Sequence, residues 1–392
     1  MGIYEQFQTI VYDPVSGGIV KVLPNQYIKS RKKLEQLVAP RPTGRYFFFY
    51  LHTPTPVDPA SFSVRIGVAG KPPTLVTPDG MDATLSLFSK EALFNLSRYK
   101  AILFKFEGGM GDYLDQADTV VAVQKEYPHI KMSALIDFTR SRVLRLLEGF
   151  EEVKILTSKE YIRGRSATID FARITRVGAH YPVGGKVGVY SLIAGLDHPA
   201  VRAKFCLSPA SLEEADLIID KACGRAHGKL IALHTMSGNT NTKSIKPANA
   251  LKIITPLLKN QDLIFLHLGG AGEEAIDHPQ VISLQGKLPW EKVVAVMACC
   301  DGCVCIDSAI MHIAQHLGIP TVSLWGPTTP QHILAEDPGV ETVVTTAPCA
   351  GCNQYNCDHC DCMTRFDKKD LYRKLRKLGG TKNAEILPND GD

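Results

Sequence analysis

Residues 303–328 read CVCIDSAIMHIAQHLGIPTVSLWGPT. The apolar run 303–306 predicts a buried strand, and the spacing of the apolar residues in 309–317, ended by Gly318, predicts a helix. A second apolar run, 321–324, predicts the next strand. A strand, a helix and a strand in this order are typical of a parallel α/β sheet.

The same alternation extends through two runs of the chain. Around the quoted stretch we predict further strands at 230–234 and 263–268 and helices at 248–258 and 290–298. An earlier run has predicted strands at 101–106, 131–136 and 153–156 and helices at 112–127 and 139–147. The fold class is therefore α/β, with two doubly wound, Rossmann-like domains. The helix-like stretch 212–223 lies in a connecting region, 157–228, that the pattern does not resolve.

We expect four parts in the chain. Residues 1–97 form a partly β N-terminal extension, with strand-like runs at 45–51 and 62–68. Residues 98–225 and 226–366 are the two α/β domains. Residues 367–392 are a basic C-terminal helix and tail.

Composition excludes several classes of protein. The 392 residues are 45% hydrophobic and 21% charged, which is typical of globular proteins. No stretch reaches the roughly 18 apolar residues of a spanning helix, and residues 1–23 lack the pattern of a secretory signal, so we expect a cytoplasmic protein. The net charge of +4 is too small to indicate a nucleic-acid partner.

The loop at residues 107–112, EGGMGD, lies between a predicted strand and a predicted helix. Its glycines let a ligand approach the backbone, and the helix start offers unpaired N–H groups. Asp112 is either the N-cap of that helix or a group that acts on a ligand. The spacing is neither the dinucleotide fingerprint nor a P-loop, which disfavours an oxidoreductase.

A second loop, at residues 307–312, occupies the same kind of position. Asp307 follows a buried strand and Ala309 opens a helix. Ser308 and the first helical N–H groups can bind a diphosphate, and His312 lies one turn further on the same face. The alternative is that Ser308 is an N-cap and His312 a satisfied core histidine.

Five of the eleven cysteines lie within fourteen residues, in the pattern C-x2-C-x4-C-x2-C-x-C that ends at Cys362. A structural zinc or iron ion could be held by Cys349, Cys352, Cys357 and Cys360. His359 adds a further candidate ligand, and a compact loop of reduced cysteines is the alternative. Cys299, Cys300, Cys303 and Cys305 lie in an apolar context and are expected to act as small hydrophobes.

The segment 367–378 places Leu371, Leu375 and Leu378 at helical spacing among six Lys and Arg residues. Such a helix can be attracted to anionic lipid. A terminal helix with a solvated basic face is the simpler interpretation.

Two motifs, GGxGD at residues 108–112 and DSAxxHIAxxxGIPTVxLWGPTxP at residues 307–330, together resemble the family 9 glycosyltransferases. The best known members are ADP-heptose:lipopolysaccharide heptosyltransferases. Between these motifs, Lys243 and Lys246 downstream of His234, and the loop 268–274, are similar to the family's other two donor-site loops. No counterpart is placed for residues 1–97.

The resemblance implies a GT-B architecture with two Rossmann-like domains facing a cleft. The acceptor would bind residues 98–225 and the nucleotide sugar residues 226–366, with inversion at the anomeric carbon and no catalytic metal. Asp112 matches the proposed general base, with Asp115, three residues on, as the backup. The implied donor-binding residues are Gly109, Gly111, Lys243, Lys246, Glu273, Glu274, Asp307, Ser308, Ala309 and His312.

We therefore expect an inverting glycosyltransferase that moves heptose from ADP-heptose to a hydroxyl of a glycan, of a lipopolysaccharide core or of a protein. Peripheral contact with the inner membrane surface would suit a lipid-linked acceptor. The sequence Lys243-Ser244-Ile245-Lys246 leaves open which lysine contacts the donor. The alternative is a non-catalytic nucleotide-sugar-binding or scaffold protein of the same fold.

Overall fold

The computed structural model describes six strands before residue 90 and, from residue 100 on, residues 100–156, 167–171, 185–194, 196, 199–224, 228–238, 241–334, 337–352, 354, 357 and 361–379. The chain divides into two compact units. The first comprises Met1–Lys204 and Gln331–Glu336, and the second Phe205–Pro330 and Asp337–Asp392.

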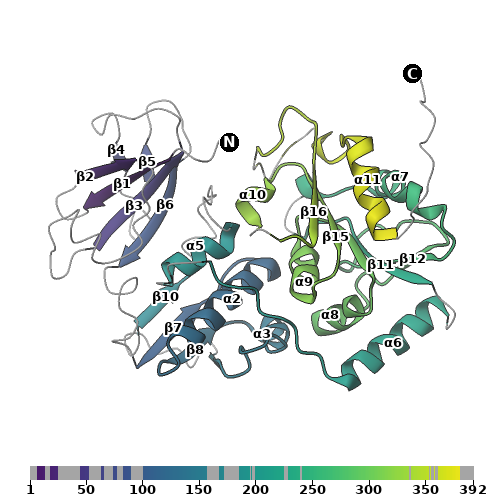
Figure 1. Ribbon diagram of the computed structural model, residues 1–392, viewed down its shortest axis with the longest axis horizontal. Helices are drawn as coiled ribbons and strands as arrows, with labels where there is room; N and C mark the ends of the chain where they lie inside the picture. Colours follow the sequence, from purple (N-terminus) through teal and green to yellow (C-terminus); the bar gives the residue numbers. More distant parts are fainter. Residues whose placement is uncertain are drawn as a thin grey trace. The chain divides into compact units, whose positions relative to one another are not determined.

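The first ninety residues contribute two antiparallel sheets (Figure 1). In one sheet the strand order is β2-β1-β3-β6, with β1 at Phe7–Asp13, β2 at Gly18–Pro24, β3 at Arg45–His52 and β6 at Ala83–Ser89. The short strands β4 (Ser63–Arg65) and β5 (Thr74–Val76) pair separately. The predicted strand 45–51 is confirmed as β3, and the predicted run 62–68 contains β4, with residues 62 and 66–68 outside the described residues.

A four-stranded parallel sheet follows in the first unit. Its order is β10-β7-β8-β9, with β7 at Ala101–Lys105, β8 at Lys131–Leu135, β9 at Lys154–Leu156 and β10 at Ala167–Asp170. Its helices are α2 (Met110–Glu126), α3 (Phe138–Leu144) and α5 (Gly185–Ile193). The strand order reverses between β7 and β10, which makes this the switch point of the sheet.

The second unit contains a six-stranded parallel sheet of order β13-β12-β11-β14-β15-β16. Its strands are β11 (Lys229–His234), β12 (Leu263–His267), β13 (Val281–Ser283), β14 (Gly302–Ile306), β15 (Thr321–Trp325) and β16 (Val340–Val344). This is the order of a dinucleotide-type Rossmann domain, and its switch point lies between β11 and β14.

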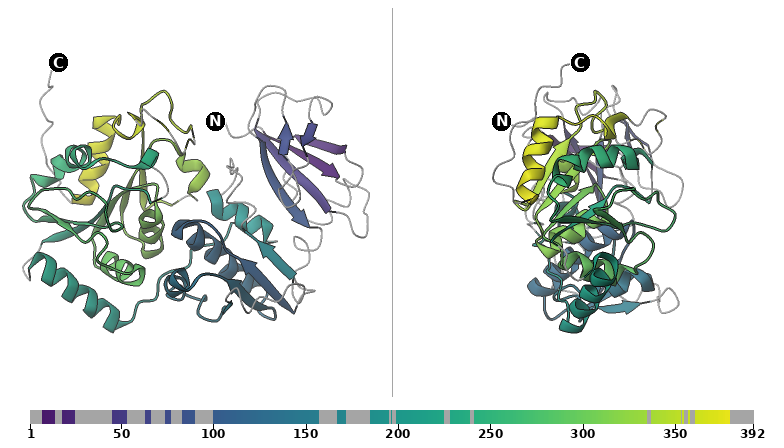
Figure 2. Two further views of the ribbon diagram at one scale, coloured as in Figure 1. Left: turned by 180° about the vertical axis from the view of Figure 1, so that it is seen from behind. Right: turned by 90° about the vertical axis from the view of Figure 1, so that its right-hand side faces the viewer.

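Helices cover both faces of that sheet (Figures 1 and 2). On one face α7 packs against α11, and on the other α8 packs between α6 and α9. Their bounds are α6 Pro209–Cys223, α7 Pro247–Leu258, α8 Trp290–Ala298, α9 Ala309–Leu317 and α11 Lys368–Gly379, with short helices η4 at Asn241–Lys243, α10 at Pro330–Ile333 and η5 at Asp361–Met363. Because α6 packs on α8, the second unit begins before α6, at Phe205, whereas the sequence pattern places the boundary at residue 225.

The apolar side of the C-terminal helix is part of the core. Leu371, Leu375 and Leu378 are buried beside α7 and the sheet, and Lys374 donates to the carbonyl oxygen of Thr342 at 2.7 Å. An amphipathic helix that inserts into a membrane surface needs a free apolar face. Helix α11 therefore has the features of a terminal helix with a solvated basic face. No helix in the described ranges is long and apolar enough to cross a membrane.

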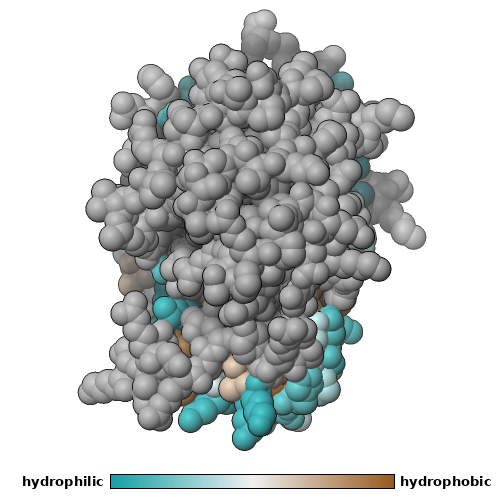
Figure 3. Space-filling model, turned by 90° about the vertical axis from the view of Figure 1, so that its left-hand side faces the viewer, coloured by the Kyte–Doolittle hydropathy of each residue, from teal (hydrophilic) through white to brown (hydrophobic). Residues whose placement is uncertain are grey.

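The surface of the described residues is largely polar. On the face drawn in Figure 3 their colours are mainly hydrophilic, with a few hydrophobic spots. Large hydrophobic side chains that are exposed in these ranges are Phe138, Val201, Leu217 and Val344. They are scattered, so the position of a site has to be inferred from the sheets and their loops.

Candidate functional site

Switch points are the natural places for ligands in doubly wound sheets. The loops that leave two neighbouring strands there diverge to opposite faces and leave a crevice at the carboxyl ends of the strands. Asp112 lies in the loop and helix that follow β7. Asp307 lies directly after β14. Both predicted acids therefore lie beside a switch point, one in each unit.

Asp112 is the third residue of α2 and completes its start. Its Oδ2 accepts a hydrogen bond from the backbone N–H of Gly109 at 2.9 Å. Gly108 has a φ of 112°, and a Cβ on it would overlap the Asp112 carboxylate, which explains the glycine there. The capping role is thus real, but each carboxylate oxygen has two lone pairs, so capping does not exclude chemistry.

A lysine that the sequence pattern did not single out contacts Asp112 from the other side of the switch point. The Nζ of Lys186, on α5, lies 2.6 Å from Oδ1 of Asp112, with side chains 22% and 17% exposed. Strand β10 and helix α5 lie in the region that the pattern did not resolve. The available signal was the pair Gly184-Gly185, a helix start directly before Lys186.

The other predicted residues of this loop are placed less favourably. Asp115, the backup base, is 1% exposed on α2, so an acceptor hydroxyl cannot reach it in this conformation. Gly109 and Gly111, predicted as donor-binding, lie at the start of α2 in the first unit. Of these residues, Asp112 is the one with a carboxylate that remains partly accessible.

At the switch point of the second unit, Asp307 holds two side chains. Its Oδ2 accepts from Nζ of Lys243 at 3.2 Å and from Oγ1 of Thr328 at 2.8 Å. Lys243 ends η4, which follows β11, whereas Lys246 is exposed and is the backbone N-cap of α7. The structure therefore brings Lys243, and not Lys246, to Asp307.

Ser308 precedes α9, but its hydroxyl does not cap the helix. Its Oγ lies 3.0 Å from Nδ1 of His234, the last residue of β11. That pair spans the switch point and leaves the start of α9, at Ala309, without a side-chain cap among the described residues. His312 is buried, with 4% exposure, and its carbonyl oxygen contacts Nδ1 of His316.

Two buried histidines behind this loop are held neutral. Burial, with smaller contributions from His267 and Lys243, lowers the pKa of His234 to about 3. Burial likewise lowers the pKa of His267 to about 4, and its Nε2 lies 3.1 Å from Oγ1 of Thr235. A neutral imidazole can donate a hydrogen bond to a hydroxyl or accept one from it. His234 and His267 can therefore orient the hydroxyls of Ser308 and Thr235 without adding charge.

The loop after β12 distinguishes Glu273 from Glu274. Oε1 of Glu273 accepts from the backbone N–H of Gly270 at 2.8 Å, and a Cβ on Gly269 would overlap the Glu273 carboxylate. Glu274 is exposed, and it is its carbonyl oxygen that contacts Nε2 of Gln285, at 3.5 Å. Glu273 is therefore the fixed acid of this loop.

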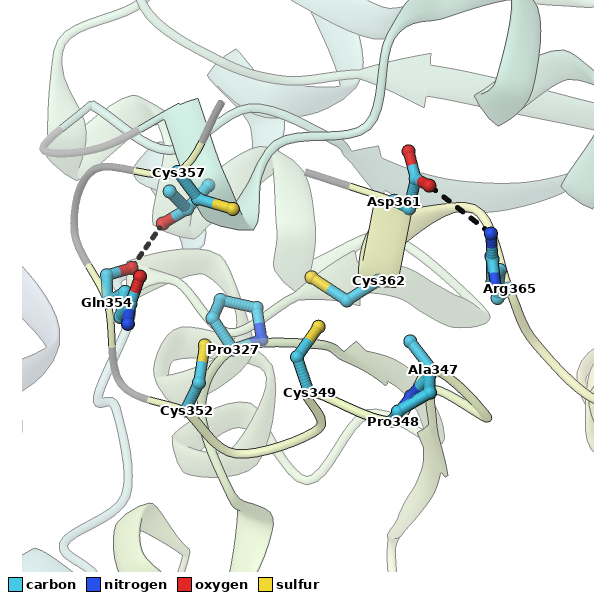
Figure 4. Close-up of a pocket in the computed structure, with 11 residues that line it drawn as sticks. Pro327, Ala347, Pro348, Cys349, Cys352, Gln354, Cys357, Asp361, Cys362 and Arg365 are labelled. Atoms are coloured by element: carbon cyan, nitrogen blue, oxygen red, sulfur yellow. Dashed lines mark hydrogen bonds and ion pairs between the residues drawn. The ribbon is translucent and has the colours of Figure 1, made fainter. Parts of the chain in front are cut away.

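Four cysteines line one pocket of about 330 Å³ (Figure 4). They are Cys349, Cys352, Cys357 and Cys362, and the sulfurs of Cys349 and Cys362 point toward one another. Cys360 and His359 lie outside the described residues. Within the described ranges no three His, Cys, Asp or Glu side chains are grouped closely enough to hold an ion.

The buried Cys300 has a thiol pKa raised by burial, as expected for a small hydrophobe.

The cysteine loop is hydrogen-bonded near both sides of the switch point of the second unit. Oγ1 of Thr242, next to Lys243, donates to the carbonyl oxygen of Gln354 at 3.0 Å. The backbone N–H of Gly351 donates to the carbonyl oxygen of Gly326, two residues before Thr328, at 2.9 Å. Both residues that hold Asp307 are thus adjacent to attachment points of this loop.

Comparisons with known proteins agree with the resemblance. Residues 271–362 match the model of glycosyltransferase family 9 (heptosyltransferase). This stretch contains Glu273, the 307–312 loop and the cysteine cluster. No curated protein matches the chain by sequence. The predicted resemblance to family 9 is confirmed.

Solved structures confirm the predicted GT-B fold class. Escherichia coli ADP-heptose lipopolysaccharide heptosyltransferase II is 14% identical, with a TM-score of 0.55, and the match covers 71% of this chain and 98% of that one. TibC, an iron-containing dodecameric glycosyltransferase from enterotoxigenic E. coli H10407, is 13% identical, with a TM-score of 0.55 and coverages of 95% and 91%. A complex of TibC with ADP-D-β-D-heptose gives a TM-score of 0.53 at the same identity and coverages.

The two matches include different shares of this chain. The match to TibC leaves about 5% of this chain, about 20 residues, unmatched, so it includes most of residues 1–97. The match to heptosyltransferase II leaves 29% unmatched while covering nearly all of that enzyme. A structural counterpart of the extension therefore exists, although the sequence pattern did not reveal one.

The buried histidines predict a pH-dependent stability. Below about pH 6.5 the unfolded chain protonates His234 and His267, whereas the folded chain does so only near pH 3 and pH 4. As the pH is lowered from about 6.5 to 4, the free energy of unfolding should therefore decrease by about 1.4 kcal/mol per pH unit for each histidine. Urea unfolding of the reduced protein at pH 7, 6 and 5 measures this.

His234→Gln should reduce that slope by about half, leaving the contribution of His267. His129→Gln, at an exposed histidine, should leave the slope unchanged. An equal slope in wild type and His234→Gln would contradict the assignment of a neutral, buried His234.

Proposed function

We propose that this protein is an inverting glycosyltransferase that moves heptose from ADP-heptose to a hydroxyl of a glycan or protein acceptor. The observation that carries the proposal is the family 9 match over residues 271–362, because it includes the loop after β14, on one side of the switch point of the second sheet. The complex of the similarly folded TibC with ADP-D-β-D-heptose supports the choice of donor.

In the proposed reaction Asp112 is the general base. The acceptor oxygen attacks the anomeric carbon as its proton passes to the Asp112 carboxylate, and the bond from that carbon to the diphosphate oxygen breaks with its electron pair. Attack on the face opposite the departing diphosphate inverts the anomeric centre. A positioned carboxylate contributes about 100- to 10,000-fold to such a proton transfer.

The leaving diphosphate gains charge as the bond breaks, and the second unit offers positive groups for it. Lys243 has three donor hydrogens and uses one of them toward Asp307. The start of α9, at Ala309, contributes the positive end of a helix dipole because the Ser308 hydroxyl points to His234 instead. We propose these two groups, together with Ser308, for the diphosphate and Glu273 for the nucleoside or sugar.

The acceptor is proposed more broadly, as a hydroxyl of a glycan, of a lipopolysaccharide core or of a protein. The match to heptosyltransferase II uses nearly all of that enzyme and leaves 29% of this chain over, a share about as large as residues 1–97. We propose that this sheet adapts the transferase to an acceptor of its own. A cytoplasmic location and contact with the inner membrane surface remain part of the proposal for a lipid-linked acceptor.

We also propose a structural zinc or iron ion at the cysteine loop, held by Cys349, Cys352, Cys357 and Cys360. Thiolates are preferred ligands of both metals, and three of these four line one pocket, but they are not grouped closely enough to hold an ion as they stand, so binding would require the loop to draw their sulfurs together. The similarly folded TibC is iron-containing. The ion would stiffen the loop that Thr242 and Gly326 hold, and the transfer itself passes through no metal.

The central test is substitution of the base. The purified, reduced protein should bind ADP more tightly than UDP, GDP or CDP by isothermal titration, and should release ADP from ADP-heptose. Asp112→Asn keeps an oxygen for the Gly109 N–H but cannot take a proton, so turnover should fall about 100- to 10,000-fold with ADP affinity unchanged.

Asp137→Asn is the matched control, because Asp137 is also a cap, of α3, at the same edge of the sheet. It should leave turnover within a few-fold of wild type. An equal loss of ADP affinity in Asp112→Asn would show that Asp112 only holds the loop, and ADP binding without any turnover would favour the non-catalytic alternative.

The two lysines of the η4 region give a second prediction. Lys243→Met should weaken ADP binding about 10- to 100-fold, the usual value of a charge-assisted hydrogen bond, whereas Lys246→Met should stay within two-fold. Isothermal titration measures both. A larger effect at Lys246 would reverse the assignment.

The metal site predicts about one equivalent of zinc or iron in protein purified under reducing conditions. Elemental analysis should show its loss in Cys349→Ser and its retention in Cys206→Ser, at an isolated exposed cysteine. Comparing Cys360→Ser with Cys362→Ser identifies the fourth ligand, since Cys362 lines the same pocket. A wild-type protein free of metal would refute the site.

A further inference from the structure

The contact between Lys186 and Asp112 has no part in the function proposed above. It joins helices α5 and α2, which follow β10 and β7 on the two sides of the switch point. The 2.6 Å separation is that of a charge-assisted hydrogen bond. Both side chains are largely covered, at 22% and 17% exposure, so solvent screens this pair less than a surface ion pair.

The start of α5 is held in place by backbone packing. Gly185 has a φ of 60°, and a Cβ there would lie 2.6 Å from the carbonyl carbon of Leu334 and 2.7 Å from the carbonyl oxygen of Ile333. Those two residues belong to the segment 331–336 that joins the first unit. A glycine is therefore required directly before Lys186, and the lysine is presented from a fixed position.

A second tie fixes α5 against α2. Oγ1 of Thr119, two turns beyond Asp112 on α2, lies 3.4 Å from Oγ of Ser191 on α5. The ring of Tyr190 packs edge-on against Phe171, directly after β10. The geometry of the Lys186 and Asp112 pair thus follows from the packing of its two helices.

We propose that Lys186 is a positioning residue for the general base, holding the Asp112 carboxylate ionised and in one orientation. The proposal rests on the function proposed above. With Oδ1 held by Lys186 and Oδ2 by the backbone of Gly109, the carboxylate is held in one orientation.

The charges around Asp112 explain why a cation is needed. Its own loop and helix carry the acids Glu107 and Asp115, and like charges favour protonation of a carboxylate. Helix α3, which packs on α2, brings Arg140, but that guanidinium pairs with Asp137 at 2.6 Å and lies over the ring of Tyr113. Among the described residues, Lys186, from α5, is the cation whose contact with Asp112 is seen.

The first test is the pH dependence of ADP release from ADP-heptose, with water as acceptor. In Lys186→Met the acidic limb of the kcat/KM profile should move up by about one to two pH units, and the dissociation constant of ADP should not change. Lys186→Arg should restore the wild-type limb. Lys125→Met, at the far end of α2, is the matched control and should not move it.

A second readout does not depend on activity. In protein labelled with [13C]aspartate, the carboxyl resonance that disappears in Asp112→Asn belongs to Asp112, and in Lys186→Met its titration midpoint should rise by a similar amount. If wild type releases no ADP, the proposed function fails while this measurement still decides whether the pair exists. An unchanged midpoint, or a rise only in the KM for ADP-heptose with kcat unchanged, would overturn the positioning role.

Discussion

The site depends on one constraint, the cost of placing a carboxylate at the switch point of a parallel sheet. The crevice between diverging loops covers much of the side chain, and a covered charge is unfavourable unless it is paired. Both units meet this cost in the same way. Asp112 and Asp307 each follow one strand beside the switch point, and each is paired with a lysine that follows the strand on its other side, Lys186 and Lys243.

This arrangement couples charge to topology. The partner lysine comes from the opposite side of the switch point. Each ion pair therefore links the two segments that follow the neighbouring strands there. The glycines beside the acids serve the same geometry. Gly108 leaves space for the Asp112 carboxylate and Gly185 lets α5 start against the backbone of 333–334, so the pair in the first unit requires both glycines.

Much of this could be predicted from the sequence. Apolar strands with long amphipathic helices between them, such as β14, α9 and β15, carry a strong periodic signal, and their predicted bounds agree with the structure to within a residue. Strands β13 and β10, of three and four residues, are too short for such a signal, and β16 is largely half-buried, with a glutamate inside it. Missing β10 also concealed α5 and Lys186.

The side-chain partners could not be predicted in the same way. The sequence does not distinguish Lys243 from Lys246 as the lysine of this loop. Lys243, at the end of η4, contacts Asp307, whereas Lys246, at the start of α7, is exposed. Ser308 has the position of a ready N-cap, yet its hydroxyl pairs with His234, which is 74 residues away in the sequence. Such choices are made by tertiary contacts that spacing does not encode.

The cysteine loop contacts both sides of the switch point of the second unit. Its stem is closed where Thr345 and Thr346 bond the carbonyl oxygen of Arg365, and its middle is bonded to Thr242 and Gly326. Lys243 and Thr328, the two donors to Asp307, are therefore each within two residues of a residue that is hydrogen-bonded to that loop. The ends of the loop are anchored in the core through Ala347, Cys362 and Met363, and its middle is bonded beside the two groups that hold Asp307, so the order of the loop and the position of those groups are linked.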